Sequence, residues 1–426
     1  MLQVDPKHRR STRTEHRIFV AAVAVGLVHA VDDAVVNPQP GVEITQHLVA
    51  LAVVGIGALL AVWVFPRVRP GLRSALALTA GVLVGANAAL HLLHIAVANL
   101  QGSDLTGALA AVAALVLVAL AGYIPFRHRG ERPVRVVHRW ARRVFVVVIG
   151  LLVAQFVLVP VVIGMVQTHK FREHVGDPPN PDFRAVSFRS SDGLRLSGWY
   201  LPSRNGAAVV VVSSAGGDRA GSKRHARLLG RSGYGVLTYD ARGSGESEGT
   251  PNGWGWGWED DVDGAIDFLQ DQPDVTVDVV GGLGLSTGAD VLLEVAAHNR
   301  DLGAVVADGA TARSFADKPP GALDAPLMWT MFASGRLFSG ESPGEPLTEV
   351  VSAAAPTPIL LVASGSLPGE LFLNDRYAAA GPSTTLWRLP DVSHTNAINQ
   401  RREEYQRRVI AHFDGALLDT DRRRRP

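Results

Sequence analysis

The sequence predicts an α-helical membrane domain of five transmembrane helices, followed by an α/β domain with a mostly parallel sheet. Three observations support this fold class. Residues 1–170 hold five long apolar runs, a Pro-rich segment follows them, and the remaining residues alternate short Val-rich runs with helical ones. The chain has 426 residues, enough for two or three domains. Only 19% of them are charged, against about 25% in typical soluble domains, which favours membrane spans.

Five apolar runs are the predicted spans. They are Ile18–Val36, Leu48–Val64, Ala75–Val97, Leu105–Ile124 and Val144–Val166. Each approaches the roughly 20 residues that a helix needs to cross about 30 Å of hydrocarbon. The first run lacks a convincing small-residue cleavage site and four more runs follow it, so we interpret it as a retained helix rather than a signal peptide.

Basic residues between the runs predict the orientation. Lys and Arg cluster before the first run, between the second and third, and between the fourth and fifth, where "FRHRGERPVRVVHRWARR" holds seven arginines. The two other loops, "NPQPGVE" and "NLQGSD", contain neither Lys nor Arg. Because cytoplasmic loops retain positive charge, the sequence predicts a multi-pass protein of the cell membrane with a cytoplasmic N-terminus. Five crossings then place everything after Val166 outside the cytoplasm.

Ionisable residues lie within or beside the predicted spans, all near their outer ends. The candidates for a shared site are His29, Asp33, His47, His91 and His94. Imidazole and carboxylate at such spacings can ligate one metal ion, with zinc as the expected metal. Charged groups inside a membrane are costly, so a metal or proton site is one hypothesis for them. Interhelical hydrogen bonds near the outer surface are the alternative. The chain has no Cys, which excludes disulfides, thiolate zinc ligands and thiol catalysis.

The second half is organised as a single α/β domain. The strand candidates are an opening hairpin around Asp192-Gly193, then "AAVVVVSS", "YGVLTYD", "VVGGLGLS", "GAVVADG", "PILLVAS" and "TTLWRLP". Helices are predicted at Lys223–Leu229, Glu259–Leu269, Ala289–His298, Asp375–Ala379 and Gln400–Phe413. Continuous apolar strands are typical of a parallel sheet covered on both faces. The predicted boundaries are a basic N-terminus at 1–17, membrane helices at 18–166, a linker at 167–181, the α/β domain at 182–415 and an Arg-rich tail at 416–426.

One polar residue stands between two glycines where a predicted strand becomes a predicted helix. The segment is "GLSTG", with Ser286 flanked by Gly284 and Gly288. A nucleophile at a tight strand-to-helix turn needs neighbours without side chains, and the following helix directs N–H groups at a developing oxyanion. A glycine-rich turn with a capping Ser is the alternative. The sequence order of the remaining parts favours the nucleophile.

Over about Asp182 to Phe413, the sequence resembles the α/β-hydrolase family. The matching segments are "AGGDRAGSKRHARLLGRSGYGVLTYDARGSGESEG", "GLSTG" and "VSHTN". The resemblance implies a Ser, acid, His order along the chain, with Ser286 as nucleophile and His394 as base. The acid should follow "PILLVAS", where Glu370 and Asp375 are available. We favour Glu370, since Asp375 has a ready structural role as the cap of the next helix. No cofactor is expected for this chemistry.

The predicted oxyanion hole departs from the common family pattern. Many relatives carry His-Gly after the third strand, whereas this chain has Ser213-Ser214-Ala215-Gly216-Gly217. Backbone N–H groups form the hole, so the function survives the change, with Gly216 and Thr287 as the expected donors. Trp329, Met331 and Phe332 are candidates for a pocket wall, with core packing as the alternative. The run Trp254, Trp256 and Trp258 fits either an entrance or a membrane surface.

These features predict a membrane-anchored serine hydrolase that cleaves an ester, thioester or amide outside the cytoplasm. Esterase or lipase activity is favoured over peptidase or acyltransferase activity, because an adjacent bilayer supplies lipidic substrates. The expected partners are the lipid bilayer and a small-molecule or lipid ester, and no feature points to nucleic acid. The alternative is a membrane transport or metal-binding protein that uses the His/Asp cluster, with the hydrolase domain accessory or inactive. The sequence determines neither the substrate nor the oligomeric state.

Overall fold

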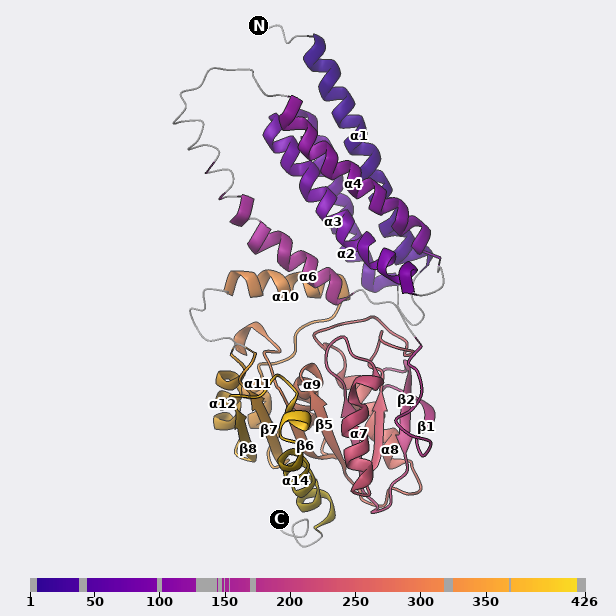
Figure 1. The fold of residues 1–426 in the computed structure, drawn as a ribbon, viewed down its shortest axis with the longest axis vertical. Coiled ribbons are helices and arrows are strands. Elements are labelled where there is room, and N and C mark those ends of the chain that lie inside the picture. The colour runs from indigo at the N-terminus through magenta and orange to yellow at the C-terminus, as the bar shows by residue number, and fades with distance from the viewer. Residues whose placement is uncertain are drawn as a thin grey trace. The chain divides into compact units, whose positions relative to one another are not determined.

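The chain divides into two compact units. The computed structural model describes residues 6–37, 44–97, 102–127, 144, 148, 150–152, 154–168, 174–317, 325–367 and 369–419. The helical unit comprises Met1–His169 and Pro326–Gly340, and the α/β unit comprises Lys170–Ala325 and Glu341–Pro426. Figure 1 shows both, with the helical unit in indigo to magenta and one orange helix, α10.

The helical unit contains five stretches long and apolar enough to cross a membrane. They are Thr12–Val36, His47–Arg67, Pro70–Ala89, Asp104–Arg127 and Gly150–Gln167. Their helices are α1 (Pro6–Val31), α2 (Ile44–Val64), α3 (Pro70–Val97), α4 (Asp104–Arg127) and α6 (Val159–Gln167), with π-helical turns at Asp32–Val36 and Ala154–Leu158. Each stretch overlaps one of the five runs predicted from sequence, so the expectation of five apolar helices is confirmed.

Small residues and a buried ion pair hold the helical unit together. An added Cβ at Gly81 would lie 3.2 Å from the carbonyl oxygen of Ala114, so glycine allows α3 and α4 to pack closely. The rings of Phe19 and Phe65 stack with centroids 4.2 Å apart. Arg73 forms an ion pair with Glu15 at 2.5 Å, and both side chains are buried. Burial makes this pair costly to break, because removing one partner leaves the other charge without compensation.

The α/β unit is built on one eight-stranded sheet in the order β1-β2-β4-β3-β5-β6-β7-β8. The strands are β1 (Arg184–Arg189), β2 (Arg195–Leu201), β3 (Ala208–Val212), β4 (Gly235–Tyr239), β5 (Val280–Leu285), β6 (Leu302–Asp308), β7 (Ile359–Ser364) and β8 (Thr384–Leu389). Strand β2 pairs antiparallel with β1 and with β4, and every other pairing is parallel. The sheet is therefore mostly parallel, as predicted.

Helices cover both faces of the sheet, so its central strands are apolar throughout. One face carries α8 (Glu259–Gln270), α9 (Thr287–His298), α11 (Leu347–Ala353) and α12 (Glu370–Ala380). The other carries α7 (Lys223–Arg231), α13 (Ala397–Gln400) and α14 (Arg402–Phe413). Along β3, Val210 packs into the first layer and Val209 and Val211 into the second. Each fully buried Val contributes roughly 1.5–3 kcal/mol, which explains the run of four valines.

Three elements differ from the sequence-based expectation. Helix α12 begins at Glu370 rather than Asp375, so Asp375 lies within the helix and the prediction that it caps the helix is wrong. The predicted tail begins later than residue 416, because Asp414–Leu418 form a π-helical turn and Leu417 is buried. Residues 420–426 lie outside the described residues. Helix α10 (Ala325–Ser339) groups with the apolar helices, although the interval 182–415 includes it.

Candidate active site

Ser286 occupies a strained turn between β5 and α9. Its φ of 52° and ψ of −116° lie in a region that non-glycine residues rarely adopt. The backbone is crowded there: a Cβ at Gly284 would overlap the carbonyl of Gly288, and a Cβ at Gly288 would overlap that of Val212. The N–H of Ser286 donates to the Asp308 carbonyl at 2.8 Å. Both glycines are therefore required by the turn, as the "GLSTG" pattern predicts.

His394 lies on the loop after β8, within hydrogen-bond distance of Ser286. Its Nε2 is 2.9 Å from Ser286 Oγ. Its backbone N–H donates to Ser366 Oγ at 2.7 Å, which fixes the loop. An added Cβ at Gly309 would lie 2.7 Å from His394 Cε1, so this glycine makes room for the ring. Two loops thus position the imidazole against the hydroxyl.

Glu370 is the carboxylate that contacts His394. Its Oε2 lies 2.7 Å from His394 Nδ1, and the side chain is buried. Ser364, at the end of β7, donates to the same carboxylate from its backbone N–H at 2.6 Å and from its hydroxyl at 2.9 Å. Asp375 instead forms an exposed ion pair with Arg388 on another side of α12. Of the two acids that the sequence offered, the structure brings Glu370 to the histidine.

The Glu370 carboxylate changes the pKa of the His394 imidazole. The hydrogen bond that His394 Nδ1–H donates to Glu370 raises the pKa of His394 above its ordinary value, and partial burial opposes that rise. Two further acids near the site were missed by sequence reasoning. Burial raises the pKa of Asp308 to about 7 and that of Asp290 to about 7. Asp308 ends β6, beside the nucleophile strand, and an acid closing an apolar strand is the signal that could have found it.

The predicted oxyanion donors lie on two segments, Gly216 after β3 and Thr287 at the start of α9. The N–H of Gly217 donates to the Ser214 carbonyl at 3.0 Å, so it is already engaged. Gly216 adopts a φ of 77°, the left-handed conformation that favours glycine. Thr287 is the first residue of α9, where N–H groups have no partner within the helix. Gly216 and Thr287 remain the donors predicted from the sequence.

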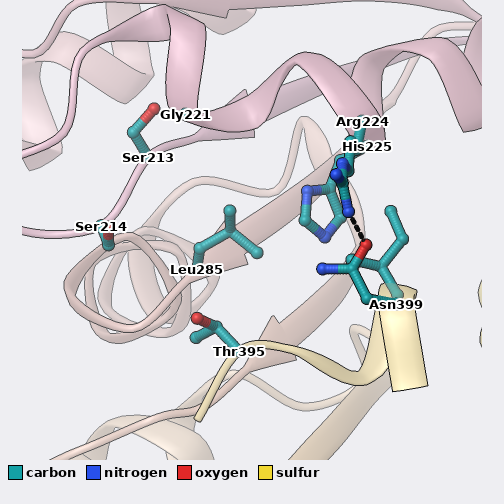
Figure 2. Close-up of a pocket in the computed structure, with 9 residues that line it drawn as sticks. Ser213, Ser214, Gly221, Arg224, His225, Leu285, Thr395 and Asn399 are labelled. Atoms are coloured by element: carbon teal, nitrogen blue, oxygen red, sulfur yellow. Dashed lines mark hydrogen bonds between the residues drawn. The ribbon is translucent and has the colours of Figure 1, made fainter. Parts of the chain in front are cut away.

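A polar cavity of about 260 Å³ lies beside these residues (Figure 2). It is lined by Ser213, Ser214, Gly221, Arg224, His225, Leu285, Thr395, Ile398 and Asn399. Leu285 and Thr395 directly adjoin Ser286 and His394 in the chain. His225 is buried, and neither of its ring nitrogens has a hydrogen-bond partner among the described residues. Burial lowers the pKa of His225 to about 4, so the ring is neutral at physiological pH. Figure 2 shows Arg224 beside it, hydrogen-bonded to Asn399.

The tryptophan run packs within the α/β unit. Trp256 and Trp258 are buried, and Trp254 stacks on Trp256 with ring centroids 5.1 Å apart. Gly255 and Gly257 adopt φ values of 72° and 80°, which produces the tight turns between the rings. For Trp256 and Trp258 this burial excludes both an entrance and a membrane surface. Trp329, Met331 and Phe332 lie on α10, in the helical unit, and do not line the cavity of Figure 2.

A polar cluster joins α1, α3 and α4 in the helical unit. His91 Nδ1 lies 3.2 Å from Asp104 Oδ1, and its Nε2 lies 3.7 Å from Asp33 Oδ1. The rings of His29 and His91 meet edge to face with centroids 4.6 Å apart. The Thr106 hydroxyl lies 3.0 Å from His29 Nδ1. These contacts are hydrogen bonds and ion pairs between helices.

The metal hypothesis gains no support from this cluster. Throughout the described part of the chain, no group of three or more His, Asp or Glu side chains is arranged to hold a metal ion. The side chain of His94 lies outside the described residues, and His47 is on α2. Sequence reasoning missed Asp104, the fully buried partner of His91. Its position at the start of an apolar helix was the available signal.

Comparisons with known proteins concern the α/β unit. Residues 192–400 match the X-Pro dipeptidyl-peptidase (S15) family. The uncharacterized protein YfhR of Escherichia coli (strain K12) is 28% identical over 247 residues, covering 55% of this chain and 82% of YfhR. The uncharacterized protein Rv2307c of Mycobacterium tuberculosis is 34% identical over 119 residues, covering 27% of this chain and 42% of its own. Among solved structures, the Pyrococcus furiosus esterase Pf2001 is 19% identical, covering 58% of this chain and 100% of its own with a TM-score of 0.47.

Proposed function

We propose that the α/β unit is a serine hydrolase of the α/β-hydrolase fold, in which Ser286, His394 and Glu370 act as nucleophile, base and orienting acid. The observation that carries the proposal is the continuous hydrogen-bonded chain from Ser286 Oγ through both ring nitrogens of His394 to Glu370. A serine hydroxyl is a weak nucleophile until a base accepts its proton. In this hydrogen-bonded chain the base is His394, and Glu370 holds its imidazole in the orientation that the reaction needs.

The reaction proceeds in two steps through an acyl-enzyme. Ser286 Oγ attacks the substrate carbonyl while His394 Nε2 accepts the hydroxyl proton. Glu370 accepts a hydrogen bond from Nδ1–H and stabilises the imidazolium that forms. The N–H groups of Gly216 and Thr287 stabilise the oxyanion. The Nε2 proton then passes to the leaving group, and water releases the acyl group by the reverse sequence.

We assign the polar cavity of Figure 2 to the polar part of the substrate. Neutral His225 offers one donor and one acceptor, and Arg224 offers a positive charge. A site of this size and polarity suits a small hydrogen-bonding group better than a long acyl chain. Esters are favoured over peptides, because five apolar helices in the same chain place lipidic esters within reach.

The proposal includes the location of the reaction. The arginine-rich segments of the chain favour a cytoplasmic N-terminus, and an odd number of crossings puts the hydrolase domain on the opposite side of the membrane. Lipid esters of the outer leaflet or small extracytoplasmic esters are then the accessible substrates.

Labelling with a fluorophosphonate probe tests the nucleophile. Wild-type protein in membranes should be labelled, whereas Ser286→Ala should lose all labelling and His394→Ala nearly all of it. Ser366→Ala, which removes only the hydroxyl that accepts from the His394 backbone, should still be labelled. Absence of labelling in folded wild-type protein would overturn the proposal, as would labelling that persists in Ser286→Ala.

A further inference from the structure

Helix α10 is attached to the last apolar helix at a defined depth. The Ser334 hydroxyl lies 2.9 Å from the carbonyl oxygen of Pro160 in α6. A Cβ at Gly164 would overlap that hydroxyl and would lie 3.1 Å from the backbone nitrogen of Gly335. The two helices therefore pack closely, with the Pro160 carbonyl and Gly164 of α6 against Ser334 and Gly335 of α10. Contacts of this kind are typical of helix pairs that pack in membranes.

The contact lies just inside the end of the span. The apolar helix ends at Gln167. At about 1.5 Å per residue, Gly164 and Pro160 lie about 5 and 10 Å before that end. Figure 1 shows α6 running obliquely to α10 and meeting it at the C-terminal end of α6. A helix that crosses the end of a span at this depth lies in the layer where headgroups meet acyl chains, the depth that interfacial helices occupy.

The exposed side of α10 has the composition of an interfacial face. Trp329, Ala333 and Arg336 are exposed and follow one another at helical spacing, with Trp329 64% exposed. On the opposite side Ser334 and Gly335 are buried. Tryptophan is enriched at the membrane–water boundary, and arginine is attracted to anionic headgroups. A large exposed indole on a helix held at this depth is thus explained by contact with lipid.

We propose that α10 is an interfacial helix whose Trp329–Ala333–Arg336 face contacts the lipid headgroups of the leaflet in which α6 ends. The chain leaves the hydrolase sheet after β6 to form α10 and returns at β7, the strand that precedes Glu370. Both ends of α10 are therefore connected through the chain to strands of the α/β sheet. This inference depends on the apolar helices crossing a bilayer and is independent of hydrolase activity.

The cysteine-free chain allows a direct test in lipid vesicles. Ala333→Cys and Gln406→Cys, each labelled with a bimane fluorophore, are reconstituted with and without lipids brominated near the headgroup. Gln406 is an exposed position on α14 in the hydrolase domain and serves as the control. Bromolipid should quench the label at position 333 at least twofold more than the label at position 406. Equal quenching at the two positions would overturn the proposal.

A second variant tests the attachment of α10 to α6. Gly164→Leu, combined with Ala333→Cys, places a side chain where Ser334 now sits and should reduce quenching at position 333 toward the control value. Circular dichroism and fluorophosphonate labelling of the same variant report whether it is folded. Unchanged quenching in a folded Gly164→Leu protein would show that contact with α6 does not hold α10 at the interface.

Discussion

Glu370 and Asp375 lie on the same helix, and their surroundings separate their roles. Glu370 is buried and accepts hydrogen bonds from Ser364 and His394, whereas Asp375 is exposed and pairs with Arg388. A buried carboxylate that holds an imidazole in one tautomer stabilises the imidazolium in the transition state. An exposed ion pair contributes about 0–1 kcal/mol and has no route to the reacting atoms.

We therefore expect Glu370→Gln to lower kcat by about 10³-fold or more, the order found when an orienting acid is neutralised. Asp375→Asn is the matched control, five residues along the same helix, and should change kcat by less than about twofold. Both are measured with a p-nitrophenyl ester. A larger loss in Asp375→Asn than in Glu370→Gln would assign the acid to Asp375 instead.

The pH profile should report the raised pKa of His394. The base must be neutral to accept the proton from Ser286, so kcat/KM falls as the pH drops below its pKa. Because Glu370 raises this pKa above the ordinary 6.5, half-maximal kcat/KM should occur above pH 6.5. Glu370→Gln removes the largest cause of the rise, so its residual activity should show the acid limb at lower pH. An acid limb at the same pH in both proteins would contradict this account.

At the scale of the element, close packing at the turn from β5 to α9 requires glycine at particular positions. The backbone of Gly288 approaches β3 so closely that no side chain fits, and Ser286 is held in a conformation that its neighbours enforce. The strained backbone conformation of Ser286 persists because backbone hydrogen bonds among β3, β5 and β6 hold the turn in place.

Gly288→Ala should therefore destabilise the folded chain by about 2–3 kcal/mol, the usual cost of overpacking a tight site. Gly176→Ala is the control, since nothing lies within 4 Å of a Cβ added there. Thermal unfolding in detergent, followed by tryptophan fluorescence, should show a lower midpoint for Gly288→Ala alone. Equal midpoints for the two variants would show that the turn relaxes without cost.

At the scale of the whole molecule, the membrane orientation is open to a cysteine test. Single cysteines at Ser11, in the basic N-terminal segment just before the first apolar stretch, and at Gln406, in the hydrolase domain, are exposed to a membrane-impermeant maleimide in intact spheroplasts. Position 406 should react at once, and position 11 only after permeabilisation, because basic segments remain cytoplasmic. The reverse pattern would place the hydrolase domain in the cytoplasm.

The sequence by itself determined the fold class, because both of its signals are local. Five apolar runs have the length of a bilayer crossing, and Val-rich strands alternating with helices require a covered parallel sheet. The α/β-hydrolase resemblance is confirmed. Ser286 and His394 could be predicted as site residues because the glycine-flanked turn and the order of Ser before His along the chain are visible in short segments.

Only the tertiary structure shows that Glu370, rather than Asp375, contacts His394, and only it shows that α10 packs with the apolar helices. Glu370 meets His394 because β7 and β8 are neighbours in the sheet, a relation across 24 residues that no local pattern encodes. The pKa of Asp308 is raised because segments remote in the sequence bury its carboxyl group. From its position in the chain, helix α10 was predicted to belong to the α/β domain. It packs instead on α6, through Gly164 and Ser334. Contacts between residues remote in sequence depend on the packing of whole elements, so local propensity could not predict them.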